Sequence, residues 1–338
     1  PCVLVEAWGL PVCLNQYLSK LNLVKGFDNL NEHQIIKEYF SDVGSAYLAE
    51  HGIRVPVGDD AAVLAPPKGK ESVISVDTSI EGVHFLKSMS ASDIAYRSVS
   101  VALSDLAACG ATPSWFTLAI TLEDYDPIWL SGFRRGLEDI SSELKVPLIG
   151  GDMTKGNVSI TVQVGGYVEK GKALTRKGAK VGDLIYLTGT IGEASSALEG
   201  IKKDNLVDLK KSRYLRPEIR FGVSNKLKGI ATSAIDVSDG LFQDLNHICT
   251  ASKVGANVYL EKVPTFLSKS LSLEEMNKGD DYEILFTSDK TNKEKIEEIS
   301  KQEKIPICEI GLIIKGYEVQ IITPEGDFLK ASSGFQHF

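Results

Sequence analysis

Residues 98–113 read SVSVALSDLAACGATP, and this stretch carries the most information about the fold. Ser90, with Asp93 three residues later, precedes this stretch and has the pattern of a capping box at a helix N-terminus. The pattern predicts a helix from about Ser92 to Cys109. The small Ala and Ser side chains would let the backbone of this helix approach a neighbouring element closely. Asp105 would share a helical face with the apolar Val101 and Ala108, where an unpaired carboxylate is costly. We therefore expect Asp105 to have a compensating partner, and a metal ion would be one such partner.

Strand-like and helix-like segments alternate on both sides of this helix, from Asp28 onward. The expected strands are 72–77, 115–121, 158–168, 184–187, 233–236, 283–287 and 315–322, and the expected helices are 31–40, 92–109, 127–144, one that ends near 198, 217–229 and 241–251. Gly150 to Asp152 is expected to form a turn. The apolar pattern lapses near 170–172, which predicts one domain over 28–170 and a second over 171–338. The fold class predicted is α/β (α+β), in two domains.

Composition and charge narrow the function classes. The chain has 338 residues, 43% hydrophobic and 24% charged, as in an ordinary globular protein. Its formal net charge of −8 does not favour sequence-independent nucleic-acid binding, which depends on Lys and Arg. If the chain binds a phosphate-rich molecule, a divalent cation would have to stand between the two anions.

The remaining composition signals point to a cytoplasmic protein. The five cysteines are scattered without a C-x-x-C pair, which favours reduced thiols over a zinc ribbon or a disulfide framework. No apolar run approaches the roughly 18 residues of a membrane span, so no membrane partner is expected.

The first residues do not fit the pattern of the rest. Residues 1–27 carry no basic start before their apolar stretch, and Glu6 interrupts that stretch, so a secretory signal is not indicated. We expect this segment to be an extension outside the fold, with a docking helix as the alternative.

One glycine motif invites a wrong assignment. Residues 166–173 follow a strand and match the spacing G-x-x-x-x-G-K, but a P-loop then requires Ser or Thr, and this chain has Ala173. The residues after it do not read as a helix, so no helix N-terminus would receive the phosphates. A lysine-rich turn is the better interpretation.

The aspartates carry the strongest chemical signal. Several of them lie beside Gly, Ala or Ser, at strand ends or in a tightly packed helix: Asp59, Asp60, Asp77, Asp105, Asp152, Asp236 and Asp239. Each one alone is most simply a turn residue or a cap. Together, with too few basic residues nearby to pair them all, they favour Mg²⁺ sites.

These same stretches resemble the thiamine-monophosphate kinase family of the AIR-synthetase-like (PurM-like) superfamily. The matching motifs are GDDAAV (58–63), SVDTSIEGVHF (75–85), SVSVALSDLAACGATP (98–113), GGDMTKG (150–156), GDLIYLTGTIG (182–192), AIDVSDGL (234–241), GDDYEILFT (279–287) and GFQHF (334–338). They occur in order and cover essentially all of 28–338. EGVHF together with GFxHF separates this family from its relatives.

The resemblance implies a fold, a reaction and an assembly. The expected fold is the two-domain PurM-like architecture, in which the N-terminal sheets pair across a homodimer and the C-terminal domain is an α/β sandwich. The expected reaction is direct, in-line transfer of the γ-phosphoryl group of ATP to thiamine monophosphate, giving thiamine diphosphate and ADP with several Mg²⁺ ions. The acceptor phosphate is already ionised at pH 7, so no residue is expected to act as general acid or base.

The resemblance also assigns residues. The implied metal ligands are Asp60, Ser75, Asp77, Asp105, Asp152, Asp236 and Asp239; the implied ATP contacts are Gly151, Asp152, Arg176 and Ser238; and the implied contacts to thiamine monophosphate are His84, Asp280 and Phe335. The chain departs from its relatives at three of these positions. Relatives often have Glu in place of Asp280 and Trp in place of Phe335, and Asn alternates with Asp at 152. An aromatic nucleotide contact expected near Arg134 is not matched.

Two other functions remain as alternatives. One is an ATP-dependent synthetase of the AIR-synthetase or selenophosphate type, although no reactive cysteine motif precedes Gly58. The other is a non-catalytic scaffold like the hydrogenase-maturation relatives, although those end in a cysteine tail and this chain ends in His337 and Phe338.

Overall fold

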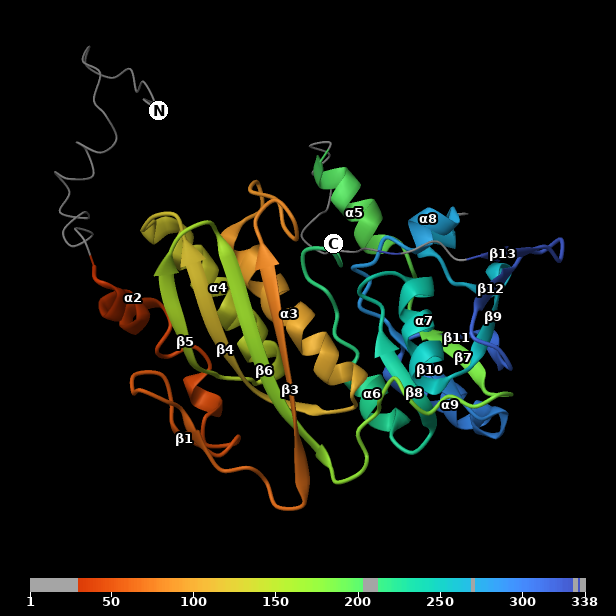
Figure 1. Cartoon of the computed structure of the whole chain (residues 1–338). Helices are drawn as coiled ribbons and strands as arrows, with labels where there is room; N and C mark the ends of the chain where they lie inside the picture. The colour runs from red at the N-terminus through yellow and green to blue at the C-terminus, as the bar shows by residue number, and fades with distance from the viewer. Residues whose placement is uncertain (1–29, 203–211, 269–270, 331–333, 335–338) are drawn as a thin grey trace, which may run out of the picture.

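The computed structural model describes residues 30–202, 212–268, 271–330 and 334, and these form two lobes side by side (Figure 1). The segment 1–27 and the site residue Phe335 therefore lie outside the described residues. No helix in the described ranges is both long enough and apolar enough to cross a membrane.

The first lobe is a four-stranded sheet with helices on one face (Figure 1). Its strand order is β3 (Lys70–Ile80), β6 (Ser159–Glu169), β4 (Thr112–Leu122) and β5 (Leu148–Lys155), with only the β4–β5 pair parallel. The covering helices are α3 (Ala91–Ala108) and α4 (Pro127–Leu144). Helix α2 (Glu32–Tyr39) and the small pair of β1 (Ile53–Val55) with β2 (Val63–Leu64) lie outside this layer.

The second lobe is a seven-stranded sheet. Its strand order is β13 (Phe328–Lys330), β12 (Val319–Ile322), β9 (Gly255–Tyr259), β11 (Ile307–Ile314), β7 (Leu184–Thr188), β10 (Ile284–Ser288) and β8 (Ala231–Asp236). The helices of this lobe are α5 (Glu193–Lys202), α6 (Phe221–Leu227), α7 (Leu241–Ser252), α8 (Leu273–Met276) and α9 (Lys293–Glu303). One core packs α7 on one face of the sheet, and a second core packs α6 and α9 on the other, as expected for an α/β sandwich.

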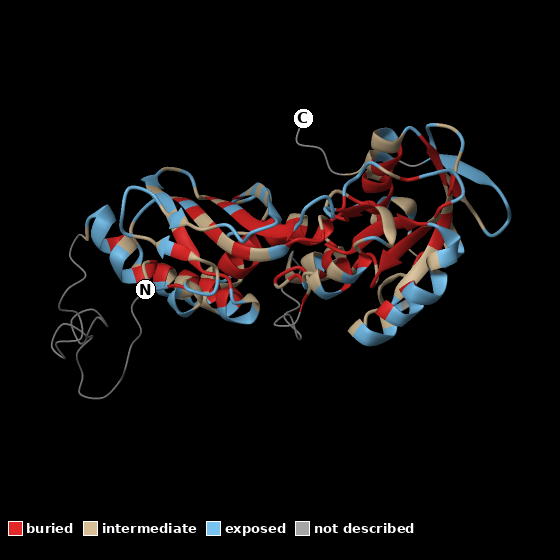
Figure 2. Cartoon of the chain, turned by 90° about the horizontal axis from the view of Figure 1, so that it is seen from below, coloured by how far each residue is buried: buried red, intermediate tan, exposed pale blue. Residues whose placement is uncertain are grey.

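Helix α3 joins the two lobes. The Ser90 side chain accepts the Asp93 backbone N–H, which is the cap that the sequence predicted. Leu103 and Leu106 are fully buried in the core of the first lobe, whereas Ala107 and Ala108 belong to the α6–α9 core of the second. Figure 2 shows buried segments in both lobes and at their junction.

A connecting segment, residues 212–220, also fastens the lobes together. Tyr214 and Leu215 are buried in the core of the first lobe, although they follow α5 of the second lobe in the chain. The guanidinium of Arg213 lies 2.5 Å from the buried Glu283 carboxylate at the start of β10. Arg216 pairs with Asp139 on α4 at 2.9 Å. The segment is thus held at both sides.

The structure corrects three predictions of local structure. Gly150 to Asp152 is part of strand β5 and not a turn, because β5 pairs with β4 so closely that a Cβ at Gly151 would lie 1.9 Å from the Leu118 carbonyl oxygen. Strand β3 continues to Ile80, so Asp77 is inside the strand and not at its end. Helix α6 begins at Phe221 and not at Pro217, because the connecting segment is engaged in contacts with the first lobe.

Other predictions are confirmed or remain open. The helices expected at 31–40, 92–109, 127–144 and 241–251 are present within one or two residues at each end. Strands β9 and β11 and helix α9 were not predicted. The domain boundary at 170 falls between β6 and β7 and stays a prediction.

The close packing of α3 on α4 gives a stability test. A Cβ at Gly136 would lie 2.1 Å from the Ser92 carbonyl oxygen, whereas the nearest atoms to a Cβ at Gly132 would be the Ala91 Cβ at 3.3 Å and the Ser92 nitrogen at 3.9 Å. Gly136→Ala should therefore lower the free energy of unfolding by about 1–3 kcal/mol, as over-packing does. Gly132→Ala is the matched control and should change it by less than about 1 kcal/mol, because its helix propensity improves. Equal values for the two variants in urea unfolding would contradict the close approach.

Candidate functional site

Two adjacent residues of α3 reach toward strands of different lobes. The Ser75 hydroxyl on β3 donates a hydrogen bond to Asp105 at 2.5 Å. The Ser104 hydroxyl donates one to Asp236, at the end of β8, at 2.7 Å. Helix α3 therefore brings a carboxylate of the first lobe next to a carboxylate of the second.

The two carboxylates line one small cavity at the junction. Its volume is about 230 Å³, and its wall includes Ser75, Asp105, Cys109, Arg176 and Asp236. Four of these residues were predicted from the sequence to be metal ligands or ATP contacts, and the structure brings them together. Arg176 lies on an exposed segment that has no helix. The structure therefore agrees with the sequence analysis that residues 166–173 do not form a P-loop.

The electrostatics of this cavity favour a cation. Burial, together with the nearby Asp105 charge, raises the pKa of Asp236 to about 7. Burial, with the charge of Asp77 adding to it, also raises the pKa of Asp105, and the Ser75 hydrogen bond and Arg176 only partly oppose this rise. A bound cation would stabilise the charged forms of both carboxylates.

The turn between β8 and α7 forms a second carboxylate cluster. The backbone N–H groups of Ser238, Asp239 and Gly240 all donate to one oxygen of Asp244, at 3.1, 3.1 and 3.2 Å. Burial and the charges of Asp236 and Asp239 raise the pKa of Asp244 to about 8. Asp239, Asp244 and His247 could together hold a metal ion, because one ligand atom from each lies within 4.8 Å of the others.

Sequence reasoning identified Asp239 in this cluster but missed Asp244 and His247. The available signal was their spacing on α7, where residues three apart share a face and Asp244 lies in the first turn. Gly334 donates its backbone N–H to Gln243 of the same helix at 2.6 Å, which places the residue before Phe335 beside this turn.

Asp280 and His84, which were predicted to contact thiamine monophosphate, lie on either side of Tyr214 of the connecting segment. Asp280 is half-buried and forms an ion pair with Arg97 of α3 at 2.5 Å. The Nδ1 atom of His84 accepts the backbone N–H of Ile80 at 3.0 Å, and its carbonyl accepts the Tyr214 hydroxyl at 3.1 Å. Tyr214 is stacked on Arg97, so the two predicted residues share one neighbourhood.

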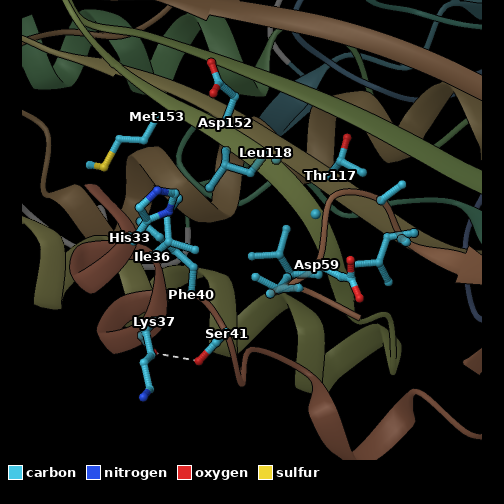
Figure 3. Close-up of a pocket in the computed structure, with 18 of the residues that line it drawn as sticks. His33, Ile36, Lys37, Phe40, Ser41, Asp59, Thr117, Leu118, Asp152 and Met153 are labelled. Atoms are coloured by element: carbon cyan, nitrogen blue, oxygen red, sulfur yellow. Dashed lines mark hydrogen bonds between the residues drawn. The ribbon is translucent and has the colours of Figure 1, made fainter. Parts of the chain in front are cut away.

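A larger pocket lies at the opposite edge of the first sheet. It has a volume of about 920 Å³ and is lined by α2, by the loop with Asp59 and Asp60, and by β4 and β5, including Gly151 and Asp152. Figure 3 shows His33, Ile36 and Phe40 on one side of it and Leu118 and Asp152 on another. Its lining combines apolar walls with exposed carboxylates, which suits a ligand with both an aromatic and a charged part.

Within one chain, this pocket is separated from the cavity at the lobe junction. In the sheet register, Asp77 on β3 pairs with Val162, which pairs with Leu118, which pairs with Gly151 on β5. Three steps between neighbouring strands amount to about 14 Å. The predicted ligands near the first sheet therefore form two groups, one at each edge, and Asp239 lies apart from the sheet in the turn between β8 and α7.

Comparison with protein families identifies both halves of the chain. Residues 58–168 match the family described as AIR synthase related protein, N-terminal domain, and residues 180–323 match AIR synthase related protein, C-terminal domain.

Individual relatives are similar over nearly their whole length. The thiamine-monophosphate kinase of Buchnera aphidicola (subsp. Schizaphis graminum) is 38% identical over 322 residues, which cover 91% of this chain and 99% of that protein. The Escherichia coli K12 enzyme of the same name is 37% identical over 321 residues, covering 91% and 98%.

Solved structures agree with these relatives. The thiamine-monophosphate kinase from Stenotrophomonas maltophilia K279a has a TM-score of 0.77 and 34% identity, covering 86% of this chain and 96% of that one. A structure described as AaThiL complexed with AMPPCP and TMP has a TM-score of 0.70 and 26% identity, covering 87% and 95%. A hydrogenase maturation protein, HypE, in complex with ATP has a TM-score of 0.73 at 17% identity, which indicates a shared fold only. The PurM-like fold inferred from the sequence is thereby confirmed, and the chain belongs to the thiamine-monophosphate kinase family of AIR synthase related proteins.

Proposed function

We propose that this chain transfers the γ-phosphoryl group of ATP to thiamine monophosphate, giving thiamine diphosphate and ADP. The observation that carries the proposal is the meeting of Asp105 and Asp236 across the lobe junction, in a cavity also lined by Arg176. Relatives named thiamine-monophosphate kinase, and a related structure with an ATP analogue and TMP, support the same reaction.

The chain's own carboxylates fit a Mg²⁺ requirement. Burial raises the pKa values of both Asp105 and Asp236, and a neighbouring carboxylate adds to the rise in each case: Asp77 for Asp105, and Asp105 for Asp236. These oxygen ligands are the type that Mg²⁺ selects. We propose Asp60, Ser75, Asp77, Asp105, Asp152, Asp236 and Asp239 as the ligands. When bound, Mg²⁺ would neutralise the charge of the transferred phosphoryl group.

The residues around the cavity would then bind and orient the two substrates. One oxygen of the acceptor phosphate forms the new bond to the γ-phosphorus while the bond from that phosphorus to ADP breaks, so no proton is abstracted from the acceptor. Arg176, with Gly151, Asp152 and Ser238, is proposed to contact ATP. His84, Asp280 and Phe335 are proposed to contact thiamine monophosphate. Catalysis by position and charge requires no acid or base from the chain.

We also propose that the active form is a homodimer built through the uncovered face of the first sheet. Three apolar side chains of β3 are exposed on that face: Ile74 at 57%, Val76 at 61% and Ile80 at 41%. If the two-fold axis ran parallel to the strands, a second copy that covered them would place its own β5 edge near this β3 edge. The two groups of predicted ligands, about 14 Å apart within one chain at the spacing of β-strands, would then meet between subunits.

The direct test is the release of ADP in a coupled assay with Mg²⁺ and ATP. Thiamine monophosphate should stimulate ADP release, and an aminoimidazole precursor or buffer alone should not. Stimulation by the precursor would instead support a synthetase of the AIR-synthetase type, and no stimulation by either would support the scaffold.

Loss of a carboxylate at the junction should abolish turnover without unfolding the chain. Asp105→Asn and Asp77→Asn should each lower kcat by about 10²–10³, the size seen when a charge-stabilising group is removed. Asp124→Asn is the control, because Asp124 is exposed on the surface and forms an ion pair with Lys155, away from the junction. Near wild-type kcat at low Mg²⁺ in either variant would remove that residue from the metal site.

The raised pKa of Asp236 predicts how stability depends on pH in the Mg²⁺-free protein. Its folded pKa of about 7 exceeds the ordinary 3.8, so the protonated form contributes stability that is complete below about pH 4 and is lost as the pH rises through 7. Between pH 5 and 7.5, wild type should lose more stability than Asp236→Asn. Mg²⁺ added at pH 7.5 should raise the melting temperature of wild type more than that of the variant. Parallel pH curves for the two proteins would contradict this assignment.

Subunit mixing tests the shared site. Asp60→Asn and Asp105→Asn homodimers should each be nearly inactive. If each site takes Asp60 from one subunit and Asp105 from the other, random exchange should restore about a quarter of wild-type activity, because half of the dimers would carry one intact site. No recovery after verified exchange would contradict a site shared in this way.

A further inference from the structure

Arg97 is a buried arginine that joins α3 to the second lobe. It is 4% exposed and lies seven residues, about two helical turns, before Ser104, on the same side of α3. Because Arg97 and Ser104 both contact the second lobe, at Asp280 and Asp236, one helix fixes the spacing between the Arg97 contact and the carboxylate cavity.

The guanidinium of Arg97 makes two hydrogen bonds and lies over two tyrosine rings, with its central carbon 5.8 Å from the centre of the Tyr282 ring. One Nη atom donates to the Tyr214 carbonyl at 2.6 Å, and the other donates to Oδ1 of Asp280 at 2.5 Å. Its central carbon lies 4.2 Å from the centre of the Tyr214 ring. The guanidinium is therefore held by hydrogen bonds at two nitrogen atoms and by contact with aromatic rings.

Within the part of the chain that the structure describes, the Asp280 carboxylate is held through its Oδ1 atom. The Tyr282 hydroxyl also donates to Oδ1, at 3.0 Å. Among the described residues, no hydrogen bond is made to Oδ2, and the side chain is 35% exposed. One oxygen is thus used to orient the carboxylate, while the side chain stays partly exposed to solvent.

The backbone around Asp280 is held in an unusual conformation. Asp280 has φ +64° and Tyr282 has φ +50°, and residues other than glycine rarely adopt such positive φ angles. The Asp280 N–H donates to the Ser238 carbonyl at 2.9 Å, and the Tyr282 N–H donates to the Val237 carbonyl at 2.8 Å. This loop is therefore tied to the turn that carries the proposed ATP contact Ser238.

We propose that Arg97 is a positioning residue for the acceptor: by holding Oδ1 of Asp280 it directs Oδ2 toward the cationic ring of the acceptor. This inference rests on the proposed function, because it assumes that Asp280 contacts the acceptor. Arg97 itself touches no substrate and acts through Asp280.

A second arginine provides a matched control. Arg216 also stacks on a tyrosine ring, with its central carbon 4.6 Å from the centre of Tyr96. It pairs with Asp93 and Asp139 at 3.3 and 2.9 Å, and neither carboxylate belongs to the proposed site. Removing Arg216 should therefore lower the stability of the protein without changing the KM for thiamine monophosphate.

The experiment measures KM for each substrate separately in wild type, Arg97→Met, Arg97→Lys and Arg216→Met. Arg97→Met should raise the KM for thiamine monophosphate about tenfold or more, the loss expected when a hydrogen bond to a charged group is removed. The KM for ATP should stay within about twofold of the wild-type value, because the contacts that bind ATP are unchanged. Arg97→Lys should raise the KM for thiamine monophosphate less than Arg97→Met does. Arg216→Met should leave both KM values unchanged.

A double variant separates positioning from packing. If Arg97 acts through Asp280, Arg97→Met added to Asp280→Asn should raise the acceptor KM no further than Asp280→Asn alone. Equal rises in both KM values, a lower melting temperature without an acceptor defect, or additive effects in the double variant would overturn the inference. A wild-type chain that releases no ADP with thiamine monophosphate would overturn the proposed function, and the inference with it.

Discussion

The hydrogen bonds of Ser104 and Asp105, neighbours on α3 that face different lobes, hold the parts of the site at fixed spacing. Asp105 accepts from Ser75 on β3, and Ser104 donates to Asp236 on β8. Such contacts are possible only because α3 is lined with small residues and buried against both cores. A buried 18-residue helix cannot bend easily to accommodate a shift of either sheet. The Asp105 and Asp236 carboxylates therefore keep their positions relative to each other.

The same helix extends this relation to the acceptor side. Arg97 ties Asp280 and Tyr214 to α3, and the loop of Asp280 is bonded to Ser238. The proposed nucleotide, metal and acceptor contacts at the lobe junction are therefore linked to one rigid element. A phosphoryl transfer without an acid or a base needs such rigidity, since position and charge are its only means of catalysis.

Much of this arrangement could be predicted from local sequence. The cap at Ser90 and the small residues of α3 identify a buried helix, and acidic residues beside Gly or Ser identify the candidate ligands. What could not be predicted depends on contacts between distant residues. Strand β5 looks like a turn in the sequence, whereas its Gly151 serves a close approach to β4. Arg97 has no motif of its own, and its role follows only from Asp280, which is 183 positions away.

The central claim is that α3 brings carboxylates from two lobes to one metal ion. Mn²⁺ can replace Mg²⁺ at oxygen ligands and is counted by electron paramagnetic resonance. We predict that Asp105→Asn and Asp236→Asn each lose the same bound Mn²⁺ in the presence of an ATP analogue, and that the double variant loses no more. If the losses of the two single variants instead add together in the double variant, the carboxylates hold separate ions and the account is contradicted.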